Sequence, residues 1–212
     1  MSSTASKLPP LATLGPFIAL ILACAFFATQ SERFLSAQNF ALILQQVMVV
    51  AVIAIGQTLV ILTAGIDLSC GMVMALGGIV MTKMAADYGL SAPVAIACGM
   101  AVTMLFGLVN GLLVTKIKLP PFIVTLGTLN IAFAATQLYS GAQTITDIPA
   151  GMTALGNTFQ LGQTAIVWGA VLMLVLYLVT WFALRETAPG RHVYAVGNSP
   201  EEFARFVQAE IP

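Results

Sequence analysis

The ionisable and nucleophilic side chains of this 212-residue chain are few, and their types limit the chemistry open to it. Eight acidic and eight basic residues are joined by one histidine, His192. No Ser/His/Asp or Cys/His set can be assembled within the apolar runs, and no G-x-x-x-x-G-K phosphate-binding loop occurs. These residues argue against a protease within those runs and against ATP hydrolysis by this chain.

Metal and nucleic-acid binding are not predicted either. Cys24, Cys70 and Cys98 lie within or beside apolar runs, with no metal-ligand or C-x-x-C spacing, so we interpret them as small hydrophobic residues. No basic block or basic-aromatic alternation is present that would favour a nucleic acid. We therefore expect this chain to bind no cofactor.

One carboxylate stands between two long apolar runs: Asp67, in the stretch GIDLSCG at residues 65–71. Gly65 and Gly71 bracket it, and Ser69 can cap a helix that follows. An Asp or Ser at a helix start accepts backbone N–H bonds and suits the positive end of the helix dipole. The residues predict a break between two helices whose carboxylate caps the second helix, and they leave a substrate or proton site at Asp67 open.

Other polar residues lie inside apolar runs, where an unpaired polar group is costly and should face another helix or water. Gln46 and Gln57 are eleven residues apart, which places them about 20° apart on one helical stripe. The run at 122–138 carries Thr125, Thr128 and Asn130. These side chains could line a wet pathway, as Asp67 could, and interhelical hydrogen bonding is the alternative for each glutamine.

A small-residue pattern occurs in the run at 92–115. Gly107 and Gly111 form a G-x-x-x-G pattern with Asn110 beside them. Such spacing lets a second helix backbone approach closely, so we predict helix packing there rather than ligand binding.

The composition indicates that the elements carrying these residues lie in a membrane. Hydrophobic residues make up 59% of the chain and charged residues 8%, with a mean hydropathy of +0.98. A bilayer core about 30 Å thick takes about 20 helical residues. We predict an all-α integral membrane protein, a polytopic helical bundle of about six transmembrane helices, at residues 11–28, 40–63, 68–84, 92–115, 122–138 and 164–184.

The charges predict the orientation of these spans. Six spans place both termini on one side, and a cytoplasmic N-terminus gives that side six basic residues against two on the other. We therefore predict a cytoplasmic segment at 1–10, a transmembrane permease domain at 11–184, and a cytoplasmic tail at 185–212. The long link at 139–163 is rich in turn residues and is predicted to follow the membrane surface. A cleaved signal peptide over the first run is the alternative for the N-terminus.

Three stretches resemble one known family. They are GQTLV at 56–60 leading into TAGIDLSCG at 63–71, NGLLV at 110–114 running on to LPPFIVTLGT at 119–128, and PGRHVYAVGNSPE at 189–201. In this order they resemble the permease subunits of bacterial ABC importers for monosaccharides, nearest to the ribose and fructose type. The similarity covers about residues 11–201.

The resemblance implies a multi-pass protein of the bacterial inner membrane and a division of labour. A periplasmic sugar-binding protein delivers the sugar, two permease copies form the pathway, and separate ATP-binding subunits hydrolyse ATP. The residues alone predict a polar tail with a short helix starting at Glu201, or a solvated tail. The resemblance implies a coupling helix that docks on the ATPase, with motif residues Gly190, Arg191, Gly197, Asn198 and Pro200.

The family pattern usually continues beyond the point where this chain ends, so we expect a truncated permease, and an inactive permease fragment is one alternative. A secondary or proton-coupled transporter using Asp67 is another. Sugars are neutral and rich in hydroxyl groups, so a pathway of Gln, Asn and Thr suits them better than rings of charge.

Overall fold

The computed structural model describes residues 11–146 and 148–198, with side chains described from residue 14. Seven α-helices, one 3-10 helix and one β-hairpin are found in these ranges. In chain order they are α1 (Leu11–Gln30), α2 (Ala37–Leu62), α3 (Cys70–Ala86), α4 (Ala92–Thr115), α5 (Pro121–Ser140), η1 (Ala150–Gly156), β1 (Thr158–Leu161), β2 (Thr164–Val167), α6 (Trp168–Glu186) and α7 (Ala188–Asn198).

Each of the six predicted apolar runs contains a helix, so the prediction of a helical membrane protein is confirmed. Four of the helices, α2, α4, α5 and α6, are long and apolar enough to cross a membrane. Helix α1 has 20 residues and is apolar over its described side chains at residues 14–30, and α3 is a shorter apolar helix of 17 residues. The predicted count of about six corresponds to these six apolar helices.

Local sequence explains where several helices begin and end. Ser36 caps α2, its hydroxyl oxygen accepting the Asn39 N–H at 3.2 Å. Proline lies in the first turn of α4 and of α5, where its missing N–H would have had no partner within the helix. Gly141 follows α5 with φ of +64°, a left-handed conformation that glycine adopts without strain.

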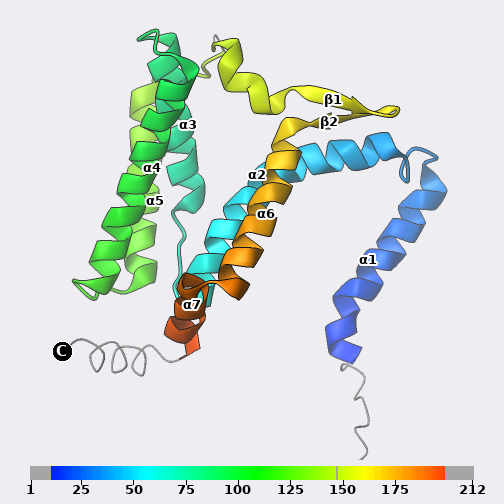
Figure 1. Cartoon of the computed structure of the whole chain (residues 1–212), viewed down its shortest axis with the longest axis horizontal. Helices are drawn as coiled ribbons and strands as arrows, with labels where there is room; N and C mark the ends of the chain where they lie inside the picture. The colour runs from blue at the N-terminus through cyan, green and yellow to red at the C-terminus, as the bar shows by residue number, and fades with distance from the viewer. Residues whose placement is uncertain (1–10, 147, 199–212) are drawn as a thin grey trace, which may run out of the picture.

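Helices α3, α4 and α5 pack side by side as one group (Figure 1). Its core contains Val73, Leu76 and Val80 of α3 and Ala132 of α5. At the crossing of α3 and α4, a Cβ built on Gly99 would lie 2.6 Å from the backbone oxygen of Gly77. Glycine at both positions therefore allows the two backbones to approach.

The close packing predicted at Gly107 and Gly111 does not occur within the described part of the chain. A Cβ built on either glycine would meet no atom within 4 Å. Within the described residues, the close approach of α3 to α4 is at Gly99, nearer the N-terminal end of α4.

The second group consists of α2, α6, α7 and the hairpin, and α1 stands apart from both groups in the view of Figure 1. Strands β1 and β2 are antiparallel, with Thr158 opposite Val167. The predicted helical start at residue 164 was wrong, because residues 164–167 form β2 and α6 begins at Trp168. Thr164, Ile166 and Val167 are β-branched residues, which favour strands.

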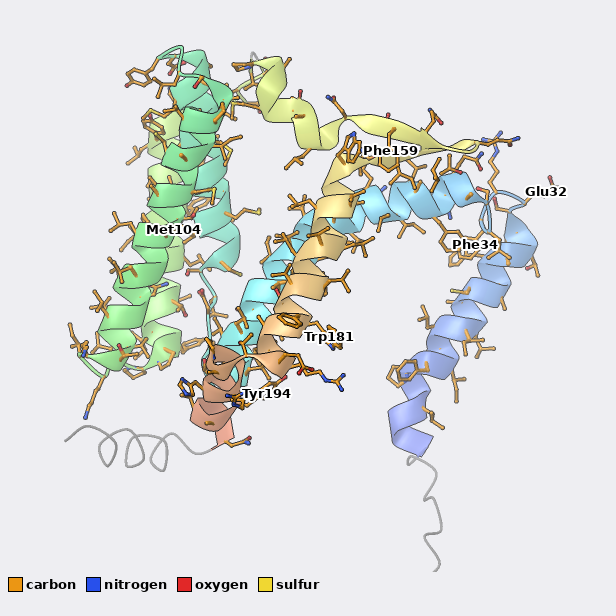
Figure 2. All side chains as sticks on the ribbon, viewed as in Figure 1. Glu32, Phe34, Met104, Phe159, Trp181 and Tyr194 are labelled. Carbon is orange, nitrogen blue, oxygen red and sulfur yellow. The ribbon has the colours of Figure 1, made fainter. Side chains whose placement is uncertain are left out.

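Apolar side chains project outward from most helices, as Figure 2 shows. Helix α2 buries no residue, and Met104 of α4 is 64% exposed. Exposed apolar surface of this extent does not suit water, whereas lipid tails or further protein cover it at no cost.

Candidate functional site

The connection between α2 and α3 is unwound and is held by Asp67. The Asp67 Oδ1 atom accepts the backbone N–H of Ser69 at 2.7 Å and the hydroxyl of the same residue at 2.6 Å. A break with a local carboxylate cap was predicted here, but Ser69 makes no side-chain capping bond to α3. Its hydroxyl donates to Asp67 instead, so the carboxylate holds the turn directly before α3 through both Ser69 bonds.

Ser69 links this turn to α4 and α5. Its side-chain oxygen accepts a hydrogen bond from Asn110 Nδ2 at 3.0 Å, and the Asn110 Oδ1 atom accepts one from the Thr128 hydroxyl. The three residues are 1%, 8% and 8% exposed, in chain order. Buried polar groups that are fully bonded in this way fix one arrangement of the elements that carry them.

Helix α2 joins the same network from the other side. The Gln57 Nε2 atom donates a hydrogen bond to the backbone oxygen of Asp67. The polar cluster Gln57–Asp67–Ser69–Asn110–Thr128, called the Asp67 network below, therefore ties α2, α4 and α5 to the unwound segment.

The network lies at a depth where a bilayer would surround the helices. Asn110 is five residues before Thr115, the last residue of α4, which is about 8 Å along the axis. Lys116 and Lys118 follow directly and suit the edge of the membrane. Unwound backbone at such depth is tolerated only where protein buries it or where it lines a water-filled cavity.

Two cavities meet at this point. The cavity on the side of α3, called the upper cavity, measures about 380 Å³, and the cavity on the side of the first turn of α5, called the lower cavity, measures about 300 Å³. Both are lined by Asp67, Gly107 and Asn110. The upper one continues along α3 and α4 to Met81, and the lower one extends to Thr63 and Thr125. Their volumes are at the small end of the range for ligand pockets, about 300–1,000 Å³.

The structure brings some of the predicted pathway residues together and separates others. Gln57, Asp67 and Thr128 belong to the network, and Thr125 lines the lower cavity. Gln46 is exposed on α2 and lines neither cavity. Asn130 is also exposed, and its Nδ2 atom donates to the Leu126 oxygen of its own helix at 2.8 Å.

The residues with predicted packing or docking roles are placed as follows. Gly107 and Gly111 line cavities, and Asn110 is an interhelical hydrogen-bonding residue rather than a packing residue. Gly190, Arg191, Gly197 and Asn198 lie in α7. Pro200 and the predicted helix start at Glu201 lie outside the described residues.

Two central residues, Ser69 and Asn110, had no pathway role in the sequence-based prediction. The signal for Asn110 was present, since an amide inside an apolar run needs a partner. Its partner Ser69 lies 41 residues away, and helical periodicity does not identify such a pair.

The side chains at the site donate and accept hydrogen bonds. Among the described residues, no three His, Cys, Asp or Glu side chains come together in a way that could hold a metal ion. Asp67 accepts both of its side-chain hydrogen bonds at Oδ1, and it lines both cavities.

These features define a class: a polytopic helical membrane protein in which a non-helical segment between α2 and α3 lines two cavities beside a buried polar cluster. The comparisons agree. Residues 39–207 match the family described as "Branched-chain amino acid transport system / permease component". The chain belongs to this family, and it is a multi-pass protein of the bacterial inner membrane.

The chain is similar to several characterised permeases. It is 44% identical to the fructose import permease protein of Rhizobium meliloti over 192 residues, covering 88% of this chain and 53% of the relative. The ribose import permease protein of Haemophilus influenzae is 35% identical over 190 residues, with 86% and 57% covered. The autoinducer 2 import system permease protein of Salmonella typhi is 32% identical over 182 residues, with 86% and 51% covered.

The chain spans about half the length of the curated relatives it matches. No solved structure matches it. The family description names an amino acid system, while the relatives are named for fructose, ribose and autoinducer 2, so family membership alone does not decide the cargo.

Proposed function

We propose that this chain is the transmembrane permease component of an ATP-driven importer of monosaccharides of the fructose or ribose kind. The observation that carries the proposal is the Asp67 network, which holds an unwound segment at membrane depth with a cavity on each side. The names of the relatives at 44% and 35% identity support a sugar as cargo.

The chemistry of the site supports a neutral, hydroxyl-bearing cargo. Where the two cavities meet, polar groups come from Asp67, Ser69 and Asn110, with Thr103 in the upper and Thr125 in the lower cavity. These groups can accept and donate hydrogen bonds. The single carboxylate, Asp67, is already bonded to Ser69 and does not form the ring of charged side chains that pathways for ions use.

The energy source and the partners are part of the proposal. The sequence has no phosphate-binding loop, so ATP would be hydrolysed by a separate ATP-binding subunit, and this chain would bind no cofactor itself. A periplasmic sugar-binding protein would deliver the cargo, and a second permease copy would complete the pathway. The tail with α7 would face the cytoplasm, because this orientation places most of the basic residues on the cytoplasmic side.

Uptake of labelled fructose and ribose by cells that produce the chain with its partner subunits tests the proposal. We expect uptake that requires an active ATPase and persists when a protonophore collapses the proton gradient while ATP is maintained. Asp67→Leu should abolish most of this uptake, and Asn130→Leu, on an exposed face, should not. Uptake that stops with the proton gradient alone would instead identify a proton-coupled transporter, and absence of uptake with all subunits in the membrane would refute the proposal.

A further inference from the structure

Helix α7 packs against the last turn of α2, directly before the unwound segment. A Cβ built on Gly197 would overlap the carbonyl oxygen of Leu62, the last residue of α2, and would lie 3.6 Å from the Cα of Thr63. Only a residue without a side chain allows the two helices to lie this close.

The other end of α7 is fixed in a similar way by α6. Gly190 is buried, and a Cβ there would overlap the carbonyl oxygens of Ala183 and Leu184 in the last turns of α6. The Thr187 hydroxyl donates to the Ala183 oxygen and accepts the Gly190 N–H at 3.4 Å. Two glycine contacts therefore determine where α7 lies between α6 and α2.

The part of α2 that α7 contacts is also a wall of the lower cavity. Val60 and Thr63 line that cavity together with Asp67. The Gly65 N–H donates to the Val60 oxygen at 2.9 Å, so the turn after α2 moves with the end of the helix. One turn earlier, Gln57 holds the Asp67 backbone oxygen. A displacement of the α2 end would reach the Asp67 network through these bonds.

We propose that Gly197 is a positioning residue, whose contact with Leu62 sets the opening of the lower cavity and thus the access of water and solutes to Asp67. The inference rests on the proposed function, because controlled access to the lower cavity serves a chain that moves a solute across the membrane. Its physical content is independent of that function: packed helices shift between discrete arrangements when a contact between them changes.

Thiol labelling at two positions tests this contact without any transport. In one chain, Cys24→Ser and Cys98→Ser leave Cys70, which lines the upper cavity but not the lower. In the other, all three cysteines become serine and Val114→Cys places a thiol on the wall of the lower cavity. Labelling rates with a small charged methanethiosulfonate reagent are measured in lipid nanodiscs, where both faces are accessible.

Gly197→Ala is the test variant and Gly56→Ala the matched control, since a Cβ at Gly56 meets no atom within 4 Å. Both changes replace a helical glycine with the better helix former, so local helix propensity changes in the same direction. We expect Gly197→Ala to change the labelling rate at position 114 by about threefold or more, through a shift in the population of the open cavity. The rates at Cys70 and in Gly56→Ala should stay near the parental values.

Gly190→Ala gives a second, independent displacement of α7, from the α6 side. Membrane yield and thermal stability in detergent identify the variants that fold, and a rate change at position 114 in either folded variant supports the proposal. Parental rates at position 114 in the folded variants, or an equal change at Cys70 and in the Gly56→Ala control, would overturn it. Labelling needs neither sugar nor ATP, so a negative uptake experiment leaves this test intact.

Discussion

Replacing Asp67 with asparagine or with leucine separates a structural cap from a required charge. Asparagine keeps an Oδ1 acceptor at the position where Asp67 receives the Ser69 N–H and hydroxyl. Leucine has a similar size and no acceptor. If the carboxylate serves mainly to fix the unwound turn, the two variants should differ in stability and in function.

The structure gives the size of the difference. Leucine removes the acceptor of two bonds at a site where Ser69 is 1% exposed, so water does not replace it. A hydrogen bond to a charged group contributes about 1.5–3 kcal/mol, which makes the expected loss in Asp67→Leu about 3–6 kcal/mol. Asparagine would keep two neutral bonds worth about 0.5–1.5 kcal/mol each, about 1–3 kcal/mol together, so Asp67→Asn should lose the remainder, about 2–3 kcal/mol.

Unfolding of the purified protein in mixed micelles measures this difference, and sugar uptake measures its functional consequence. Asp87→Leu is the control, because Asp87 lies after α3 in an ion pair with Lys83 at 2.9 Å and its side chain is half exposed. Exposed pairs contribute about 0–1 kcal/mol. If the asparagine and leucine variants lose stability equally, the reasoning about the cap is refuted. If Asp67→Asn is stable but transports nothing, the charge itself is needed.

Three further predictions concern the contacts between helices. Asn110→Leu should cost about 1–3 kcal/mol, since it removes the two hydrogen bonds that join Ser69 and Thr128 across the helices, whereas Asn130→Leu on an exposed face should cost less than about 1 kcal/mol in the same unfolding assay. Gly99→Ala should destabilise the protein by about 1–3 kcal/mol by pressing a methyl group onto the backbone of α3, and Gly111→Ala should be neutral or slightly stabilising; equal thermal stability of the two would contradict the crossing described. Tyr177→Phe removes the 3.0 Å bond to the backbone of α2 and should cost about 0.5–1.5 kcal/mol, measured as a lowered unfolding midpoint.

Hydrophobic run length and helix-ending residues predicted most helix positions. The predicted run 92–115 coincides with α4, and the run at 122–138 differs from α5 by one residue at its start and two at its end. The prediction was less accurate at residues 164–167, which form β2. Apolar, β-branched residues suit both a membrane helix and a strand, and only the pairing with β1 decides between them.

The break at Asp67 could also be predicted, but its partners could not. Local residue types show that a carboxylate between glycines can cap its own turn. They do not show that Ser69 faces Asn110 from another helix, because periodicity places residues on a face without saying which helix covers that face. Gln46 and Gln57 illustrate this, since they were predicted on one stripe and only Gln57 meets a polar partner.

The glycines of α4 explain why a small-residue pattern has two physical meanings. The lack of a Cβ permits a neighbouring backbone to approach, as at Gly99, and it also leaves space where no neighbour comes, as at Gly107 and Gly111. Gly107 lines both cavities at the level of Asp67. A side chain there would take up space at the wall that the two cavities share. In this chain, close packing between α3 and α4 at Gly99 and open space beside the Asp67 network at Gly107 therefore depend on the same residue type used in opposite ways.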